Sequence, residues 1–336
     1  MRMRGFFLST IIGVTMTLIC RKVAIKFKFL DRPNKVNKHQ EKAVPYMGGV
    51  AIFLTLIINI FINDVQIDYQ LKMLLIFSLA VMLVGLFDDK YIIGYQLKFG
   101  TQFIVAILSI VFGAKVELFN IDILNYIFSF LWIIGLMNAY NIIDGMDGLA
   151  SGIGIIVSLG FSYFTYKNSM FSMSQIMLLL AGAQAGFLIF NWPPAKIYLG
   201  DAGSLFIGYV FSIISIFCFW KEGFTYNFPI PIYLLYLPIF DTIFVFIKRI
   251  SDGKSPFKTT EDHYPRRLKK MGYSIEQIDI FSILVSITLT ILGVFINYYN
   301  RVDIGIVLVF IFTIIFTKYL LLDKEVRYEK NINSLK

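Results

Sequence analysis

Long apolar segments follow one another along almost the whole chain, and they constrain its fold more than any other feature. Each runs for roughly 16–22 residues, the length that a helix rising 1.5 Å per residue needs to cross a hydrocarbon layer about 30 Å thick. Of the 336 residues, 57% are apolar or aromatic and 16% are charged, and the mean hydropathy is +0.71. A soluble domain is usually about 45–50% apolar and about 25% charged. Because a backbone in contact with lipid must satisfy its own hydrogen bonds, the sequence predicts an all-α, polytopic membrane helical bundle.

About eleven such segments are present, and ten is the alternative count because several are near the lower length limit. They are residues 6–20, 48–62, 71–87, 99–113, 124–140, 149–166, 174–190, 204–220, 230–247, 278–298 and 304–322. We find no internal repeat and no soluble appendage. Residues 1–336 are therefore predicted to form a single integral-membrane domain.

Basic residues are concentrated on one side of the predicted membrane. Of the 31 Lys and Arg residues, 23 lie in alternate connections and the C-terminal tail, and six lie on the opposite side. Cytoplasmic connections carry the excess of Lys and Arg, so this basic side is predicted to face the cytoplasm, with the N-terminus outside and the C-terminus inside. The cytoplasmic connections of functional interest are residues 21–47, 88–98, 141–148, 191–203 and 248–277.

Cysteine and histidine are too scarce for a zinc site. The two cysteines, Cys20 and Cys218, lie in separate apolar segments, and the chain has two histidines. A metal used by this chain is therefore predicted to be a hard cation, held by carboxylate and amide oxygens.

Aspartates cluster at the predicted cytoplasmic ends of three helices. They are Asp88 and Asp89 after the third segment, Asp144 and Asp147 after the fifth, and Asp201 before the eighth. Taken singly, each group could be a solvated helix end or a helix cap. Their convergence at one membrane surface, beside several glycines, favours a hard-cation site with room for phosphates.

One further acidic residue is predicted to lie within the membrane. Asp241 falls in the Pro-Ile-Phe-Asp-Thr run of the ninth segment. An ionisable group at this depth is costly, so it is expected to face the bundle interior and to be functional. The alternative is a hydrogen bond to a polar partner on another helix.

Together these motifs resemble those of the polyprenyl-phosphate N-acetylhexosamine-1-phosphate transferases. The runs are Gly-x-x-Asp-Asp ending at Asp89, Asn-x-x-Asp-Gly-x-Asp-Gly-Leu starting at Asn141, and Asn-x-Pro-Pro-Ala…Gly-Asp-x-Gly-Ser starting at Asn191. They follow the family's order and spacing, and the resemblance extends from Asp31 to about Tyr273. The pattern is most similar to the branch that uses N-acetylglucosamine and undecaprenyl phosphate.

The resemblance implies a role for each of these residues. Asn141 and Asp201 would hold Mg²⁺, or Mn²⁺ in its place, and Asp88, Asp89 and Asp201 would be the catalytic carboxylates. Lys98 would contact the donor's pyrophosphate, and the nucleotide pocket would be lined by Asp144, Asp147, Asn191 and Tyr198, with the Tyr198 ring stacked on uracil. A cytoplasmic loop that closes over the sugar and phosphates would contain His263, Arg266 and Arg267.

The implied reaction transfers N-acetylhexosamine-1-phosphate from a UDP-sugar to a polyprenyl phosphate and releases UMP. It would begin a cell-envelope glycan such as teichoic acid, O-antigen or capsule, at the cytoplasmic face of the plasma membrane. A phosphate monoester has a second pKa near 6 and is mostly dianionic at neutral pH. The paired aspartates are therefore expected to position groups rather than to abstract a proton. Anionic lipids are further expected partners, a homodimer is left open, and nucleic acid is not expected.

The chain departs from the family pattern in two loops, and the second departure bears on the donor. Val36 and Asn37 stand where the first basic loop usually has Arg-Lys, and the last loop has His263 without a histidine cluster. That cluster is typical of the enzyme that uses the muramoyl-pentapeptide donor, so UDP-N-acetylglucosamine is the expected donor. The pentapeptide transferase of peptidoglycan synthesis is the alternative. A membrane transporter is the alternative of a different class, since transporters also carry membrane aspartates and glycine-interrupted helices.

Overall fold

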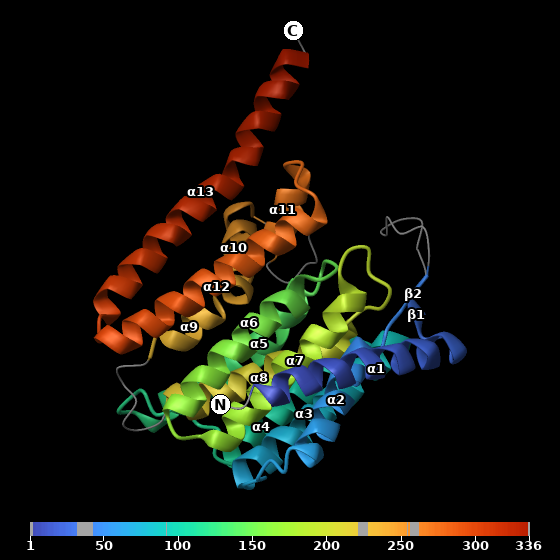
Figure 1. Ribbon diagram of the computed structural model, residues 1–336. Coiled ribbons are helices and arrows are strands. Elements are labelled where there is room, and N and C mark those ends of the chain that lie inside the picture. Colours follow the sequence, from blue (N-terminus) through green and yellow to red (C-terminus); the bar gives the residue numbers. More distant parts are fainter. Residues whose placement is uncertain are drawn as a thin grey trace. The chain divides into compact units, whose positions relative to one another are not determined.

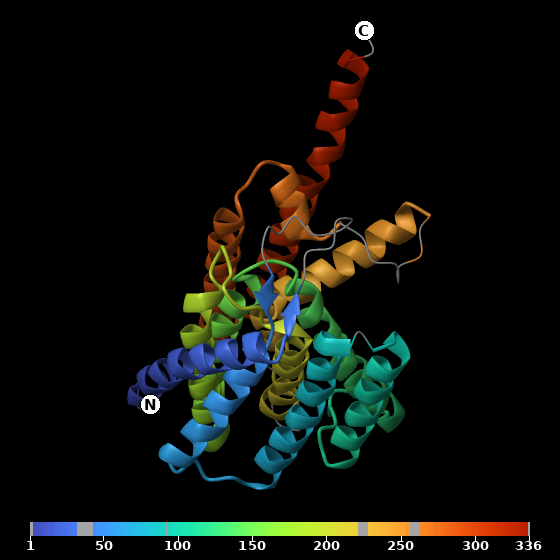
Figure 2. The same ribbon diagram turned by 90° about the vertical axis from the view of Figure 1, so that its right-hand side faces the viewer.

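The structure of the chain is a computed structural model (Figure 1), and it is seen from a second side in Figure 2. It describes residues 3–31, 43–91, 93–220, 228–253, 255 and 262–334, with the backbone alone for 322–334. Val36 and Asn37 lie outside the described residues. The chain divides into two compact units, Met1–Phe228 and Pro229–Lys336. The single membrane domain and the orientation of the termini stay predictions.

The first unit is a helical bundle with one short hairpin. Its described elements are α1 (Arg4–Lys26), β1 (Leu30–Asp31), β2 (Val44–Pro45), α2 (Gly48–Ile62), α3 (Tyr69–Tyr91), α4 (Tyr95–Val111), α5 (Asp122–Ile143), α6 (Leu149–Lys167), α7 (Phe171–Asn191) and α8 (Gly200–Phe219). Helix α8 is the central helix, because it packs against α2, α3, α5 and α6, and its apolar stretch is entirely buried.

The second unit is built around a pair of long helices. Its described elements are α9 (Ile230–Leu234), α10 (Tyr236–Ser251), α11 (Tyr264–Lys270), α12 (Ile275–Tyr299) and α13 (Val302–Ser334). Helices α12 and α13 lie side by side in Figure 1, and the short helix α11 packs on both of them.

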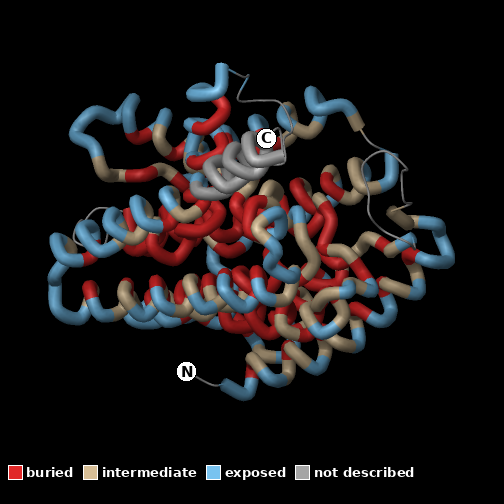
Figure 3. The backbone as a smooth tube through the Cα atoms, turned by 90° about the horizontal axis from the view of Figure 1, so that it is seen from above, coloured by how far each residue is buried: buried red, intermediate tan, exposed pale blue. Residues whose placement is uncertain are grey.

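Eight helices of the described residues are long and apolar enough to cross a membrane, and two shorter apolar helices, α2 and α4, match further predicted segments. Many helices bury one face and expose the other, as the alternating colours of Figure 3 show. Only 17% of the apolar stretch of α13 is buried, so most of its apolar side chains face outward. Apolar outward faces suit lipid as the surrounding solvent. The all-α, polytopic membrane architecture is thus confirmed.

The predicted ninth segment, residues 230–247, is divided rather than continuous. Helix α9 ends at Leu234 and α10 begins at Tyr236. Pro238 explains the division, because its ring collides with the carbonyl group four residues earlier, at Leu234, and it has no N–H to donate. Asp241 therefore lies in a 16-residue helix that begins only five residues before it.

Candidate active site

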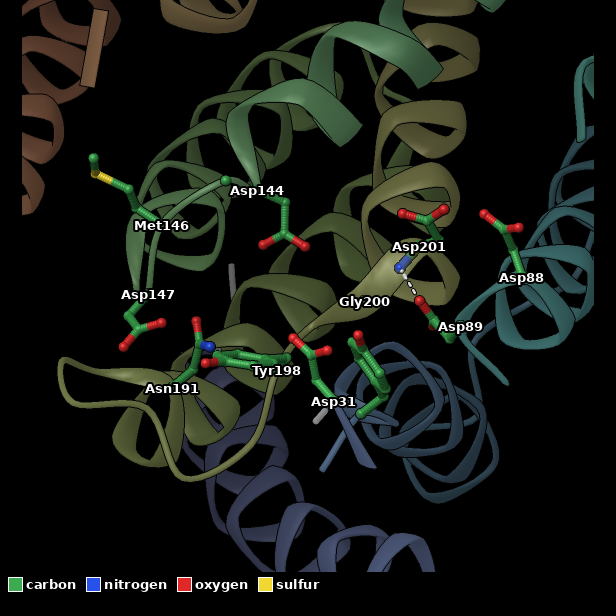
Figure 4. Close-up of a pocket in the computed structure, with 12 residues that line it drawn as sticks. Asp31, Asp88, Asp89, Asp144, Met146, Asp147, Asn191, Tyr198, Gly200 and Asp201 are labelled. Carbon is green, nitrogen blue, oxygen red and sulfur yellow. Dashed lines mark hydrogen bonds between the residues drawn. The ribbon is translucent and has the colours of Figure 1, made fainter. Parts of the chain in front are cut away.

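A cavity of about 400 Å³ lies in the first unit, where the ends of α3, α5, α7 and α8 meet the β1–β2 hairpin (Figure 4). Half of its twelve lining residues are aspartates. The lining residues are Asp31, Tyr46, Asp88, Asp89, Asp144, Gly145, Met146, Asp147, Asn191, Tyr198, Gly200 and Asp201. All five aspartates that the sequence places at helix ends thus line one cavity, together with the predicted Asn191 and Tyr198.

The hairpin forms one side of this cavity. Asp31 pairs with Val44 in antiparallel register, and the chain after β2 then binds a distant segment. The amide of Tyr198 donates to the carbonyl oxygen of Pro45 over 2.9 Å, and the amide of Gly48 donates to the Tyr198 carbonyl over 3.0 Å. These bonds tie Tyr198 to the start of α2 and place its ring beside the cavity.

Asp89 connects the end of α3 to the start of α8. Its Oδ1 accepts a hydrogen bond from the Asp201 amide over 2.9 Å, and its Oδ2 accepts one from the Ala202 amide over 3.2 Å. The first N–H groups of a helix have no partner within the helix, and Asp89 satisfies two of them from a different helix. Gly200 makes this approach feasible: its φ is +74°, and a Cβ there would lie 2.5 Å from Asp89 Oδ2.

Gly85 brings α3 close to the same turn of α8. A Cβ at this position would lie 2.5 Å from both the carbonyl oxygen of Asp201 and the amide nitrogen of Ala202. Any larger residue would therefore push the two helices apart. The glycine of the Gly-x-x-Asp-Asp run thus sets the distance at which the aspartates of α3 meet Asp201.

Asp201 is held by side chains from two other helices. The Lys98 ammonium group of α4 pairs with Asp201 Oδ2 and also lies 3.2 Å from Asp88 Oδ2. The Asn141 amide of α5 donates to Asp201 Oδ1 over 2.6 Å and to the Ser204 hydroxyl over 2.9 Å. The predicted metal ligands, the lysine and the first of the paired aspartates are therefore brought together.

Asn191 is buried, and its side-chain amide joins two loops. Its Oδ1 accepts hydrogen bonds from the Gly148 amide over 3.1 Å and the Ser151 hydroxyl over 2.7 Å, while its Nδ2 donates to the Ile197 carbonyl over 3.0 Å. Asn191 lines the cavity as predicted, but both ends of its amide bind protein. The geometry thus gives it the task of holding the loops that carry Asp147 and Tyr198.

Asp144 and Asp147 occupy the loop between α5 and α6. Asp147 Oδ2 accepts a hydrogen bond from the Ala195 amide over 2.9 Å. Burial of the Asp144 carboxyl raises its pKa well above the ordinary value, and the negative charges of Asp201 and Asp89 add to this effect. The loop therefore contributes one carboxyl that is fixed to the neighbouring loop and one that resists ionisation.

Five residues of the cavity were not predicted as site residues: Asp31, Tyr46, Gly145, Met146 and Gly200. The rings of Tyr46 and Tyr198 are neighbours, with centroids 6.1 Å apart and planes inclined at 52°. Burial and the adjacent Asp31 carboxylate, to which it is hydrogen-bonded, raise the pKa of Tyr46. Asp31 begins the stretch that resembles the family, so its position carried a signal.

The donor set of this cavity suits a hard divalent cation. One ammonium group, that of Lys98, reaches the carboxylates of both Asp88 and Asp201, so the two lie close enough for one cation to bind both. The described residues contain no group of three Asp, Glu, His or Cys side chains arranged to hold a metal. Mg²⁺ needs fewer protein ligands, because it keeps several waters and also binds substrate phosphates. Two carboxylates and the Asn141 amide fit that requirement.

The other three predicted residues belong to the second unit. His263 Nδ1 lies 2.7 Å from Asp241 Oδ2, so the buried aspartate has the polar partner that one interpretation of the sequence required. Arg267 is 5% exposed, and its guanidinium donates to Asp262 and to the Leu320 carbonyl. Arg266 is partly exposed. The Arg267 guanidinium is therefore bound by other groups of the protein.

Comparisons with known proteins agree with the motifs. Residues 71–219 match the profile of glycosyl transferase family 4. The chain is 32% identical over 279 residues to a Bacillus subtilis protein named probable undecaprenyl-phosphate N-acetylglucosaminyl 1-phosphate transferase, over 80% of this chain and 78% of the relative. Proteins named undecaprenyl-phosphate alpha-N-acetylglucosaminyl 1-phosphate transferase are similar too. That of Thermotoga maritima is 33% identical over 76% of this chain and 78% of its own length, and that of Escherichia coli K12 is 24% identical over 86% and 82%.

Proposed function

The chain belongs to glycosyl transferase family 4, and from this premise we propose that it transfers N-acetylglucosamine-1-phosphate from UDP-N-acetylglucosamine to undecaprenyl phosphate and releases UMP. It is an integral membrane protein. The observation that carries the proposal is the aspartate-lined cavity of the first unit, beside which Lys98 of α4 pairs with Asp88 of α3 and Asp201 of α8. The names of the three relatives support N-acetylglucosamine 1-phosphate as the transferred group and undecaprenyl phosphate as the acceptor.

The reaction joins two anions. An oxygen of the lipid phosphate attacks the β-phosphorus of the donor; a new P–O bond forms as the bond from that phosphorus to the oxygen bridging to the α-phosphorus breaks, and UMP leaves with the bond's electrons. The lipid phosphate needs little help from a base, because its second pKa is near 6. The paired aspartates therefore act as positioning groups: Asp89 holds the first turn of α8, and Asp88 holds Lys98.

Charge compensation is the main task of the site. Two unit charges 4 Å apart repel by about 4 kcal/mol at an effective dielectric constant of about 20, and the cavity already contains six carboxyl groups. Lys98 would contact the donor's pyrophosphate. Asp201 and Asn141 would hold Mg²⁺, or Mn²⁺ in its place. Bound Mg²⁺ supplies positive charge that offsets the phosphates in the transition state.

The opposite side of the cavity would bind the nucleoside. Tyr198 would stack on uracil, because its ring lies at the cavity wall and a base needs an apolar face of this kind. Asp144 and Asp147 would line the same pocket. Asn191 would contribute by holding their loop rather than by touching the nucleotide, since its amide is already bonded.

His263 and Arg266 would bind phosphate groups. Arg267 anchors their segment to Asp262 and Leu320. The site would lie at the plasma membrane and face the cytoplasm, which supplies the UDP-sugar. The product would begin a cell-envelope glycan. Basic connections at that face would attract anionic lipids.

A donor panel tests the proposal. Purified protein in detergent is mixed with undecaprenyl phosphate and, in separate reactions, radiolabelled UDP-N-acetylglucosamine, UDP-N-acetylgalactosamine or UDP-N-acetylmuramoyl-pentapeptide. Lipid-linked label and UMP are expected with UDP-N-acetylglucosamine, and the Asp201→Ala variant serves as the inactive control. A tenfold or greater preference for the pentapeptide donor would overturn the donor assignment, and no lipid product with any donor would overturn the activity.

A further inference from the structure

We propose that Asp241 is a positioning residue that fixes the imidazole of His263, so that the ring nitrogen Nε2 is offered to the phosphate groups of the substrate. This inference rests on the proposed function and deepens it. It concerns the second unit alone, and it assigns a task to Asp241, a buried aspartate that the reaction scheme leaves unused.

The carboxylate of Asp241 binds two consecutive residues at once. Its Oδ2 lies 2.7 Å from His263 Nδ1, and its Oδ1 accepts a hydrogen bond from the Tyr264 amide over 2.7 Å. Asp241 itself is fully buried, whereas 16% of the His263 side chain is exposed. The buried Asp241 carboxylate thus binds the partly exposed His263 ring.

The contact to Asp241 determines which nitrogen of His263 carries a proton. A carboxylate only accepts, so Nδ1 must donate to it. Nε2 is then the nitrogen left for a ligand, as a lone pair in the neutral ring or as a second N–H in the imidazolium form. The charged form suits an anionic diphosphate, because both N–H groups then point at oxygen anions. A carboxylate behind a histidine fixes its tautomer and orientation in the same manner at metal sites.

The backbone of this segment has anchors of its own. The Tyr264 hydroxyl lies 3.0 Å from the Ser282 hydroxyl, and the ring is fully buried against Phe316. Arg267 donates to the Leu320 carbonyl over 3.1 Å. Because these contacts also hold the segment, the bond from Asp241 Oδ2 to the imidazole can be removed without releasing the backbone.

The variant Asp241→Asn separates the two bonds. An amide has one accepting oxygen, whereas the carboxylate serves two donors. The Tyr264 N–H needs an acceptor at a buried site, so the amide oxygen is expected to stay there and the NH₂ group to face His263. Nδ1 must then accept, and the ring proton moves to Nε2.

Nitrogen-15 NMR of histidine-labelled protein measures this directly. The chain has two histidines, so a His39→Gln background leaves only His263 visible. At a pH where the ring is neutral, the Nδ1–H tautomer is expected with Asp241, and the Nε2–H tautomer with Asp241→Asn. The same tautomer in both proteins would overturn the proposal. This measurement does not depend on activity, so it stands even if the donor panel shows that the proposed reaction is wrong.

A double-mutant cycle tests whether Asp241 acts through His263. Asp241→Asn and His263→Gln are each expected to lower kcat with UDP-N-acetylglucosamine by about 10–100-fold. The double variant is expected to lie within about twofold of His263→Gln, because residues that act as one unit are not additive. Additive losses would show that Asp241 acts independently, and would overturn the proposal.

Tyr264→Phe is the control for a purely structural effect. Tyr264 lies on the same segment as His263. The substitution removes the Tyr264 hydroxyl that contacts the Ser282 hydroxyl, and it leaves the contact between Asp241 and the imidazole in place. It is expected to lower the unfolding temperature while keeping the His263 tautomer and kcat within about twofold. If Asp241→Asn matches Tyr264→Phe in all three measurements, its role is structural and the proposal is wrong.

Discussion

The cavity of the first unit and the Asp262–Lys270 segment of the second unit differ in their ratio of acidic to basic side chains. The cavity is lined by six aspartates, and one ammonium group, that of Lys98, pairs with two of them, Asp88 and Asp201. The segment is bound by one buried aspartate, Asp241 of α10, which contacts His263 and Tyr264, and it carries the basic residues Arg266, Arg267, Lys269 and Lys270. The cavity has too much negative charge to bind a diphosphate without added cations. The Asp262–Lys270 segment has positive groups and few acids.

The two regions are alike in how they are held. In the cavity, Asp89 and Asn191 bind backbone groups of other elements, so the positions of the loops are fixed by protein contacts. In the segment, Asp241 and Arg267 do the same for His263 and Arg266. Each region therefore contains residues that hold and residues that are left to bind a ligand. The predictions below test this division.

The largest effect is expected at Asp201. Asp201→Ala removes the carboxylate that Lys98 and Asn141 both bind, and activity should fall by about 10²–10³-fold, as for loss of one main electrostatic group. Turnover of purified protein measures this. Asp122→Ala, at an exposed aspartate beside Lys115, is the matched control and should stay active. Full turnover of wild type in EDTA would contradict the assignment of a divalent cation to this site.

The two neighbouring arginines should give opposite results. Arg266→Ala should lower turnover by about 10–150-fold, the equivalent of a charged hydrogen bond of about 1.5–3 kcal/mol, with little change in unfolding temperature. Arg267→Ala should lower the free energy of unfolding by about 1–3 kcal/mol, because it removes a buried guanidinium that donates to the Leu320 carbonyl and to Asp262. Measuring thermal unfolding and turnover for both variants separates a loss of ligand binding from a loss of stability. Equal unfolding temperatures would remove the distinction between holding and binding.

Tyr198 should affect the donor and not the acceptor. Tyr198→Ala removes a ring from the cavity wall, and stacking of a base is worth about 1–3 kcal/mol, so KM for UDP-N-acetylglucosamine should rise by about 5–150-fold. Tyr198→Phe keeps the ring and should stay near wild type. A rise in KM for undecaprenyl phosphate with an unchanged KM for the donor would move Tyr198 to the lipid side of the reaction.

The smallest effect concerns pH and Asp144. Because its pKa is raised in the folded protein, the folded state holds this proton more tightly than the unfolded state does. Stability from this group is complete below the ordinary pKa of 3.8 and is lost as pH rises toward the raised value. Asp144→Asn keeps the neutral shape at every pH. Its unfolding temperature without divalent cations should therefore gain on wild type between pH 5 and 8, whereas a constant gap would contradict the raised pKa.

The sequence predicted the membrane helices well because apolar length alone specifies them. It also predicted that Asp88, Asp144, Asp147 and Asp201 meet, since each ends or begins a helix on the same predicted side. The division of residues 230–247 carried a readable signal in Pro238, whose clash with Leu234 is a local effect.

Contacts between distant residues were beyond the sequence. Nothing in the Gly-x-x-Asp-Asp run separates Asp89, which caps α8, from Asp88, which meets Lys98. Likewise, adjacent Arg266 and Arg267 look equivalent until Arg267 is seen to bind Leu320. Tyr46 was missed because it enters the cavity only through the pairing of Pro45 with Tyr198.

A doubly labelled donor tests the central claim most directly. UDP-N-acetylglucosamine carrying tritium in the sugar and phosphorus-32 at the β-phosphate is incubated with the protein and undecaprenyl phosphate. Transfer of sugar-1-phosphate predicts both labels in the lipid product at a one-to-one ratio, with unlabelled UMP released. A lipid product with tritium alone and labelled UDP in solution would show transfer of the sugar without its phosphate, and would contradict the account.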